Sequence, residues 1–193
     1  MGVAQESYSL KNQFMERVLH VSSDGQLSTE LLENKRASTH LQPEACAEFQ
    51  LRISDGTDKE NTDRMLTNRD FRVVDVTDYT NPEHKKSKGY QFTLQNEEVW
   101  LKIRYELEAD EPFCRKSMEI VPLRDLTLER VDVEAIRLED AHQNYTIREM
   151  FAQGSHHWKP GLGQPIYTLR SASFWGMEFP AATNREEQQW IYC

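Results

Sequence analysis

Long apolar runs are missing from this chain of 193 residues. No stretch approaches the roughly 20 consecutive apolar residues that a bilayer-spanning helix needs, so we expect no membrane partner. The first residues lack the basic start and apolar centre of a secretion signal. Either the protein works in the cytoplasm or such a signal has been removed, and we favour a secreted or periplasmic location.

Cysteine and positive charge are also scarce. The three cysteines, Cys46, Cys114 and Cys193, are far apart and form no CxxC pair, so we expect neither a disulfide framework nor a metal site. A single bridge between Cys46 and Cys114 remains open. The 23 basic residues face 32 acidic ones, and the resulting net charge of −9 disfavours a nucleic-acid partner.

Sequence motifs for nucleophilic catalysis and for nucleotide binding are absent as well. The chain contains no GxSxG, no GxxxxGK[ST] and no GxGxxG. We therefore predict no cofactor.

What the chain has instead is a period of two. Apolar residues alternate with polar ones in Val99–Leu107 and in Ala47–Ile53, where Glu48 falls on the polar face. Such alternation is typical of antiparallel strands with one buried and one solvated face. We predict an all-β fold with few or no helices, a two-layer antiparallel β-supersandwich formed by residues 1–193 as a single domain.

Two local patterns refine this prediction. The alternation in Leu126–Leu138 changes phase twice, which predicts one long, bent strand with bulges near Arg130 and Ala135. The sequence Ser-Asp-Gly at residues 23–25 predicts a hairpin turn, and we favour a strand over a helical turn for residues 29–35.

Paired acids are common on the predicted strands. Glycoside hydrolysis needs two carboxyl groups that face one cleft, and Asp132 with Glu134 would share a strand face. We interpret such pairs as the solvated side of an amphipathic sheet. One of the neighbours Arg115 and Lys116 is expected to point into the sandwich, where it needs a carboxylate partner.

Residues 171–184 concentrate aromatic and apolar side chains in a short segment, which either fills a core or lines a groove. Its large side chains are Phe174, Trp175, Met177 and Phe179. Glu178 lies among them, and its burial would require a base such as Arg170 or Arg185 as partner. A structural ion pair is the simpler interpretation of this acid.

A loop rich in glycine and proline, residues 154–164, carries His156, His157 and Trp158. The simplest interpretation is a solvated loop. The functional alternative is that Trp158 stacks on a sugar ring. We expect no metal site here, because adjacent residues on a strand point to opposite faces.

The order of these segments resembles the N-terminal β-supersandwich domain of α-galactosidase-like glycoside hydrolases, the melibiase clan. The resemblance extends from about residue 14 to residue 192. It rests on residues 27–35 (LSTELLENK), 48–49, 70–71, 89–94, 103–107 (IRYEL), 115–120, 163–165 (GQP) and 174–182 (FWGMEFPAA).

In that family this domain precedes a (β/α)₈ barrel, packs on it and can support oligomers, while the catalytic acids lie on the barrel. The resemblance therefore implies a non-catalytic accessory domain, the N-terminal piece of a longer glycosidase, that scaffolds the barrel or binds a galactoside-like carbohydrate. The residues expected to contact sugar or barrel are Trp158, Phe174, Trp175, His157, Glu178 and Asn184.

Two other functions remain open. The same sandwich class is similar to aldose mutarotases and related epimerases, which open a sugar ring with a histidine and a glutamate. His156 or His157 together with Glu178 would be the candidate set. The other alternative is a protein-interaction module without a small-molecule ligand.

Overall fold

The structure is a computed structural model that describes residues 6–43, 45–55, 63–83, 86–138, 166–168, 173–178 and 182–193. These residues form β-strands and one short 3-10 helix, η1 (Asn68–Asp70). All strand pairs are antiparallel, which confirms the prediction of an all-β fold. Within the described residues, no helix has the length and apolar character that a bilayer-spanning segment needs.

The first sheet contains the N-terminal strands in the order β1-β2-β3-β4. These strands are β1 (Glu6–Lys11), β2 (Met15–Val21), β3 (Leu27–Asn34) and β4 (Thr39–Leu41). The turn between β2 and β3 contains Gly25, whose φ of 83° is open to glycine without strain. The predicted hairpin at residues 23–25 is therefore confirmed, and β3 confirms the predicted strand that follows it.

The second sheet has the order β10-β9-β8-β7, and the third has the order β14-β15-β11-β5-β6. The second is built from β7 (Arg72–Tyr79), β8 (Ser87–Gln95), β9 (Val99–Glu108) and β10 (Cys114–Pro122). The third is built from β5 (Ala45–Ser54), β6 (Arg64–Thr67), β11 (Thr127–Arg137), β14 (Arg185–Glu187) and β15 (Trp190–Tyr192). A separate hairpin consists of β12 (Ile166–Thr168) and β13 (Ser173–Trp175).

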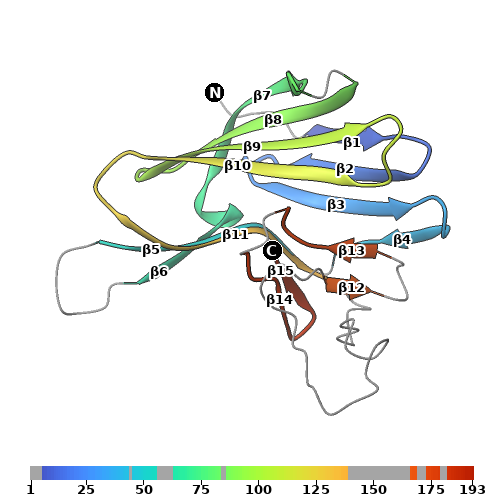
Figure 1. Cartoon of the computed structure of the whole chain (residues 1–193). Coiled ribbons are helices and arrows are strands. Elements are labelled where there is room, and N and C mark those ends of the chain that lie inside the picture. The colour runs from blue at the N-terminus through green and yellow to red at the C-terminus, as the bar shows by residue number, and fades with distance from the viewer. Residues whose placement is uncertain are drawn as a thin grey trace, which may run out of the picture.

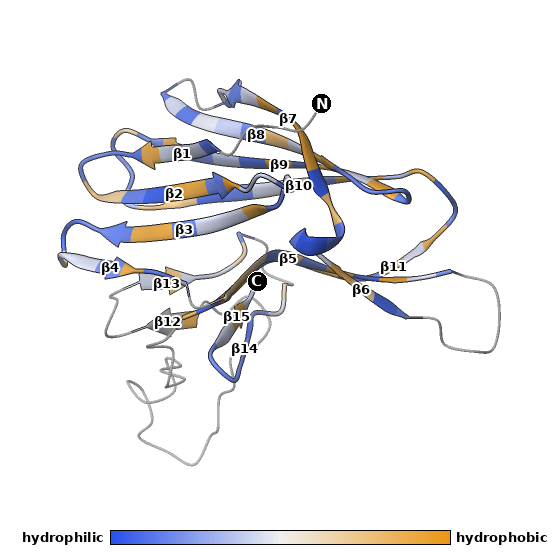
Figure 2. Cartoon of the chain, turned by 180° about the vertical axis from the view of Figure 1, so that it is seen from behind, coloured by the Kyte–Doolittle hydropathy of each residue, from blue (hydrophilic) through white to orange (hydrophobic). Residues whose placement is uncertain are grey.

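The first two sheets lie face to face, and β5 and β11 of the third sheet cross beneath them (Figures 1 and 2). The ring of Tyr8 in β1 meets the rings of Tyr90 and Phe92 in β8 edge to face, with 5.2 Å between centroids in both cases. These ring contacts join the first two sheets into a sandwich. The third sheet closes one side of this sandwich.

Inward-facing side chains of all three sheets form the main core. The odd-numbered residues from Val99 to Leu107 in β9 are buried, whereas Trp100 between them is 40% exposed, as the alternation predicts. Phe49 of β5 packs edge to face on Phe71, at 5.4 Å between centroids. A second, smaller apolar cluster lies beside β11 and consists of Leu32, Ile136, Leu138, Ile166, Ile191 and Cys193.

Bulges interrupt the pairing of β11 with β5. The register shifts after Leu128, as predicted near Arg130. Further along, Asp132 opposes Gln50 whereas Ala135 opposes Glu48, so β11 carries one extra residue in this interval. The register shifts again directly after Ala135, this time with the extra residue in β5. Both predicted bulges are confirmed.

The acidic side chains near the adjacent bulges point inward, whereas the sequence predicts that they face solvent. Each bulge allows three consecutive residues to be buried, 47–49 in β5 and 134–136 in β11. Glu48, which simple alternation places on the polar face, is 0% exposed and has the left-handed φ of 55°. Asp132 and Glu134, predicted on the solvated side, are only 3% and 6% exposed. These acids point into the protein.

Candidate functional site

A groove of about 750 Å³ opens between the first sheet, the start of β10 and the segment around β13. One wall contains Phe14, Leu32 and Leu41 of the first sheet, and the opposite wall contains residues 112–116 and 173–178. Buried charged side chains lie at the floor. We call this space the groove.

The segment around β13 brings two aromatic side chains to the groove. Phe174 is 58% exposed, although a large apolar side chain gains free energy by burial. Trp175 packs against the second apolar cluster, and its indole nitrogen donates a hydrogen bond of 3.1 Å to Ser173 Oγ. The indole is therefore held in place by its own hairpin, and the phenyl ring of Phe174 is presented to solvent.

Two further aromatic rings in the groove wall are each covered by an arginine. The guanidinium of Arg36 lies over the ring of Phe14, and that of Arg115 lies over the ring of Phe113, with 4.5 Å to the centroid in both cases. A guanidinium in this position is attracted to the face of the ring, and its N–H groups can still donate to acceptors.

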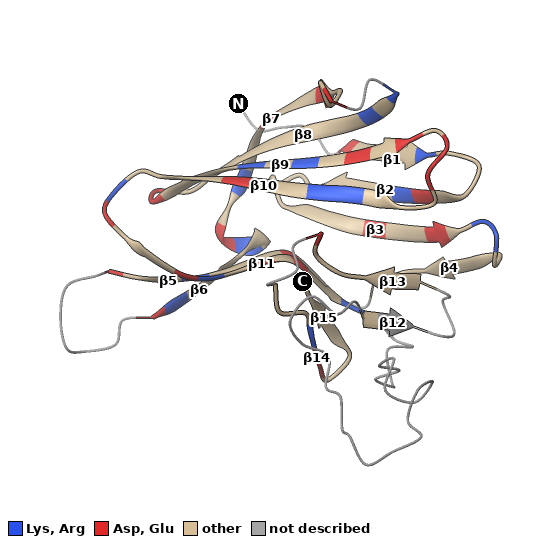
Figure 3. Ribbon diagram, viewed as in Figure 1, with Lys and Arg blue, Asp and Glu red and all other residues tan. Residues whose placement is uncertain are grey.

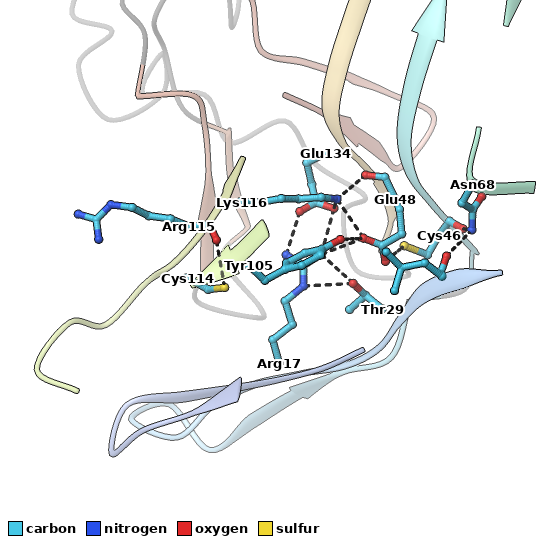
Figure 4. Close-up of polar contacts among 11 residues, drawn as sticks. Arg17, Thr29, Cys46, Glu48, Asn68, Tyr105, Cys114, Arg115, Lys116 and Glu134 are labelled. Atoms are coloured by element: carbon cyan, nitrogen blue, oxygen red, sulfur yellow. Dashed lines mark hydrogen bonds and ion pairs between the residues drawn. The ribbon is translucent and has the colours of Figure 1, made fainter. Parts of the chain in front are cut away.

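The floor of the groove belongs to a buried cluster of charges that joins all three sheets (Figure 4). We call it the charge cluster, and its members are Arg17, Glu48, Lys116 and Glu134, with Tyr105 and Thr29. Arg17 and Thr29 come from the first sheet, Tyr105 and Lys116 from the second, and the two acids from the third.

All three guanidinium nitrogens of Arg17 donate hydrogen bonds within this cluster. Nη1 and Nη2 donate to the two carboxylate oxygens of Glu134, at 2.9 and 3.2 Å. Nε and Nη2 also donate to Thr29 Oγ1, at 3.1 and 2.7 Å, and Nη2 lies 3.3 Å from Glu48 Oε2. The guanidinium carbon stands 4.7 Å from the ring centroid of Tyr105.

Lys116 of β10 binds the same two acids as Arg17, from the second sheet. Its ammonium donates to the side chain of Glu48 at 2.9 Å, to the backbone oxygen of Glu48 at 2.6 Å and to Glu134 at 3.3 Å. Three acceptors match the three N–H groups of an ammonium. The prediction that one of Arg115 and Lys116 points inward and meets a carboxylate is confirmed, with Lys116 as the inward residue.

The electrostatics of the cluster fix its protonation. Burial alone would raise the pKa of Glu48, but Lys116 and Arg17 outweigh it and hold this pKa well below its usual value. Burial alone would lower the pKa of Arg17, but Glu134, Tyr105 and Glu48 raise it well above its usual value. Burial and Glu48 raise the pKa of Tyr105. At neutral pH the cluster therefore holds Glu48 ionised, so this carboxyl is no general acid.

No protein-family model matches this chain, and no curated protein or solved structure matches it either. The described residues contain no group of three or more His, Cys, Asp or Glu side chains placed to hold a metal ion. All three cysteines are free, so the bridge between Cys46 and Cys114 is not formed.

The structure brings three of the sequence-predicted residues together in the groove: Phe174, Trp175 and Glu178. Asn184 is fully buried and does not line the groove. His157 and Trp158 lie outside the described residues.

Glu178 differs from its prediction in both surroundings and partner. Its side chain is 74% exposed, and one oxygen lies 3.2 Å from Nε of Arg115. Arg185, proposed from the sequence as its partner, instead donates to both carboxylate oxygens of Asp132 at 3.0 and 2.9 Å. The other proposed partner, Arg170, lies outside the described residues.

The sequence interpretation missed the charge cluster and the Arg36–Phe14 pair. A usable signal existed for Arg17, because it occupies the same strand face as the buried residues Leu19 and Val21. No comparable signal existed for Arg36, because its place depends on where the turn between β3 and β4 meets the turn between β1 and β2.

Proposed function

We propose that this β-sandwich binds carbohydrate in the groove and does not itself catalyse a reaction. The observation that carries the proposal is the pair Phe174 and Trp175 on the wall of a groove of about 750 Å³. Aromatic faces of this kind stack on the C–H face of a sugar ring, and a groove of this volume falls in the range of small-molecule sites.

The state of the acids supports binding rather than hydrolysis. A glycosidase needs one protonated carboxyl and one free carboxylate across a cleft. Glu48 is ionised and fully buried, and both oxygens of Glu134 accept from Arg17 or Lys116. Glu178 is largely exposed and ion-paired with Arg115, and Glu33, the other carboxylate of the groove, lies 3.8 Å from His40 Nδ1. None of these groups is arranged to give a proton to a leaving sugar.

The proposal includes the accessory role that the α-galactosidase resemblance implies, in which a sandwich positions sugar for a catalytic barrel. The mutarotase alternative has less support among the described residues, because no histidine of that part of the chain lines the groove. Its candidate residues His156 and His157 lie outside the described residues.

The test is a calorimetric titration of the full chain with galactosides and with other neutral di- and trisaccharides. Trp175→Ala and Phe174→Ala are expected to weaken binding by about tenfold or more, which corresponds to the loss of one aromatic contact. Trp100→Ala is the matched control, since this tryptophan is 40% exposed on the outer face of β9 and does not line the groove.

The expected pattern is loss of affinity in the two groove variants and wild-type affinity in Trp100→Ala. Absence of binding to every sugar would overturn the proposed function, and so would equal losses in all three variants. Thermal unfolding should show that Phe174→Ala folds as well as the wild type, because the ring is already 58% exposed.

A further inference from the structure

The cations that line the groove differ in what they already bind. Three of them form ion pairs with carboxylates of the chain: Arg17, Arg115 and Lys116. The fourth, Arg36, stacks on Phe14 and has no ion-pair partner among the described residues. It lines the groove and lies in the turn between β3 and β4, part of which has the blue of Lys and Arg in Figure 3.

An unpaired arginine in this groove is significant because acids outnumber bases in the chain by 32 to 23. Carboxylates are abundant, yet none within the described part of the chain forms an ion pair with this guanidinium. The carboxylates lining the groove are Glu33, Glu134 and Glu178, and the buried Glu48 pairs with Arg17 and Lys116 beneath them. Glu134 and Glu178 are bound to cations of the chain, and Glu33 lies 3.8 Å from His40 Nδ1. Arg36 is therefore the groove cation whose charge is not compensated by an ion pair with any carboxylate of the described residues.

The form of the site favours a carboxylate. The guanidinium of Arg36 lies over the ring of Phe14, and its planar fork of N–H groups matches the two oxygens of a carboxylate. One unpaired cation balances a single negative charge. A doubly charged phosphate or a polyanion is less suited, because the whole chain carries a net charge of −9.

The places of Arg36 and Trp175 along the groove suit a short oligosaccharide. Leu32 and Leu41 are paired across β3 and β4; Leu32 belongs to the second apolar cluster, and both Leu41 and Trp175 pack against that cluster. The last pair of this hairpin lies two residues further along, about 7 Å at strand spacing, and Arg36 is in the turn beyond it. A ring stacked near Trp175 and an acidic group near Arg36 can thus belong to the same ligand.

We propose that the ligand of the groove is an oligosaccharide that contains a uronic acid, and that Arg36 binds its carboxylate while neighbouring sugar rings contact Trp175 and Phe174. This inference rests on the proposed carbohydrate-binding function. It adds the chemical class of the sugar and a residue that determines specificity.

The test compares two disaccharides of identical linkage, a uronic acid disaccharide and its carboxyl-reduced neutral counterpart, by titration calorimetry. The wild type is expected to bind the acidic form about tenfold more tightly, as one charge-assisted pair provides. Arg36→Gln should bring the two affinities to within about twofold, because it removes the charge and keeps a polar side chain. Arg69→Gln removes an exposed arginine of η1 that does not line the groove, and should leave the ratio unchanged.

The outcomes distinguish a failure of the uronic-acid inference from a failure of the proposed carbohydrate binding. If the wild type binds both disaccharides equally, or if Arg36→Gln keeps the preference for the acid, the inference is wrong and the sugar site stands. If neither these disaccharides nor the neutral sugars of the first titration bind, the proposed function itself fails. Thermal unfolding of Arg36→Gln checks that the variant is folded, which an exposed turn residue permits.

Discussion

Arg17 of β2 and Glu134 of β11 form a bidentate ion pair inside the protein, although 117 positions separate them in the chain. Both side chains are at least nine-tenths buried. Lys116 and Glu48 complete the charge cluster, so that each charge is compensated by neighbours from another sheet. The cluster therefore links the three sheets at the floor of the groove.

Removal of one member should be costly, because it leaves the others buried without full compensation. Arg17→Met is expected to lower the free energy of unfolding by about 3–5 kcal/mol, measured by urea denaturation. Arg104→Met is the control, since Arg104 pairs with the partly exposed Glu119, and a pair of this kind contributes about 1 kcal/mol or less. Equal costs for the two variants would show that the cluster adds nothing to stability.

The regular strands of this fold could be predicted from the sequence, because simple burial produces a simple alternation. Val99–Leu107 is the clearest case, with every second residue in the core. The hairpin at residues 23–25 and the bulges in β11 were also predictable, from turn chemistry and from phase changes. Each of these signals is local in the chain.

The charge cluster could not be predicted in the same way, because it depends on pairing between distant strands. Glu48 follows the polar phase of its strand, and only the bulge opposite β11 turns it inward. The partner of Glu178 was mispredicted for a related reason. Arg185 is near it in the chain but binds Asp132, whereas Arg115 is distant in the chain and close in space.

The depressed pKa of Glu48 predicts a loss of stability in acid. Its pKa in the folded state lies below the ordinary value of 4.5 that applies to the unfolded chain. The carboxylate therefore stabilises the fold above about pH 4.5, and this contribution is lost as the pH falls toward the folded-state pKa. Urea denaturation at a series of pH values should show the decline.

Glu48→Gln is the matched variant for this pH dependence. It should be less stable than the wild type at neutral pH, because Lys116 and Arg17 lose a carboxylate partner. The difference in unfolding free energy between the two proteins should shrink as the pH is lowered. A difference that stays constant down to about pH 3 would contradict the assignment of this effect to Glu48.

The three thiols should react slowly in the native protein. Burial raises the pKa of Cys114 to about 11 and that of Cys193 to about 12, and it also raises the pKa of Cys46. At about pH 8 very little thiolate is present, and thiolate is the reactive form. Titration with a chromogenic disulfide reagent should give slow release in buffer and rapid release of three equivalents in urea. Fewer than three equivalents in urea would indicate a disulfide.

Gly89 in β8 should tolerate no side chain, since β9 passes too close to it. A Cβ at this position would overlap with the backbone oxygen of Tyr105 and would lie 3.2 Å from Cα of Glu106. Backbone atoms inside a paired sheet cannot move aside as a flexible side chain can, so Gly89→Ala should cost about 2–3 kcal/mol or more. Lys88→Ala, an exposed change one residue away, should stay within about 0.5 kcal/mol of the wild type. Thermal or urea unfolding compares the two, and a Gly89→Ala variant as stable as Lys88→Ala would show that β8 and β9 are further apart than the structure places them.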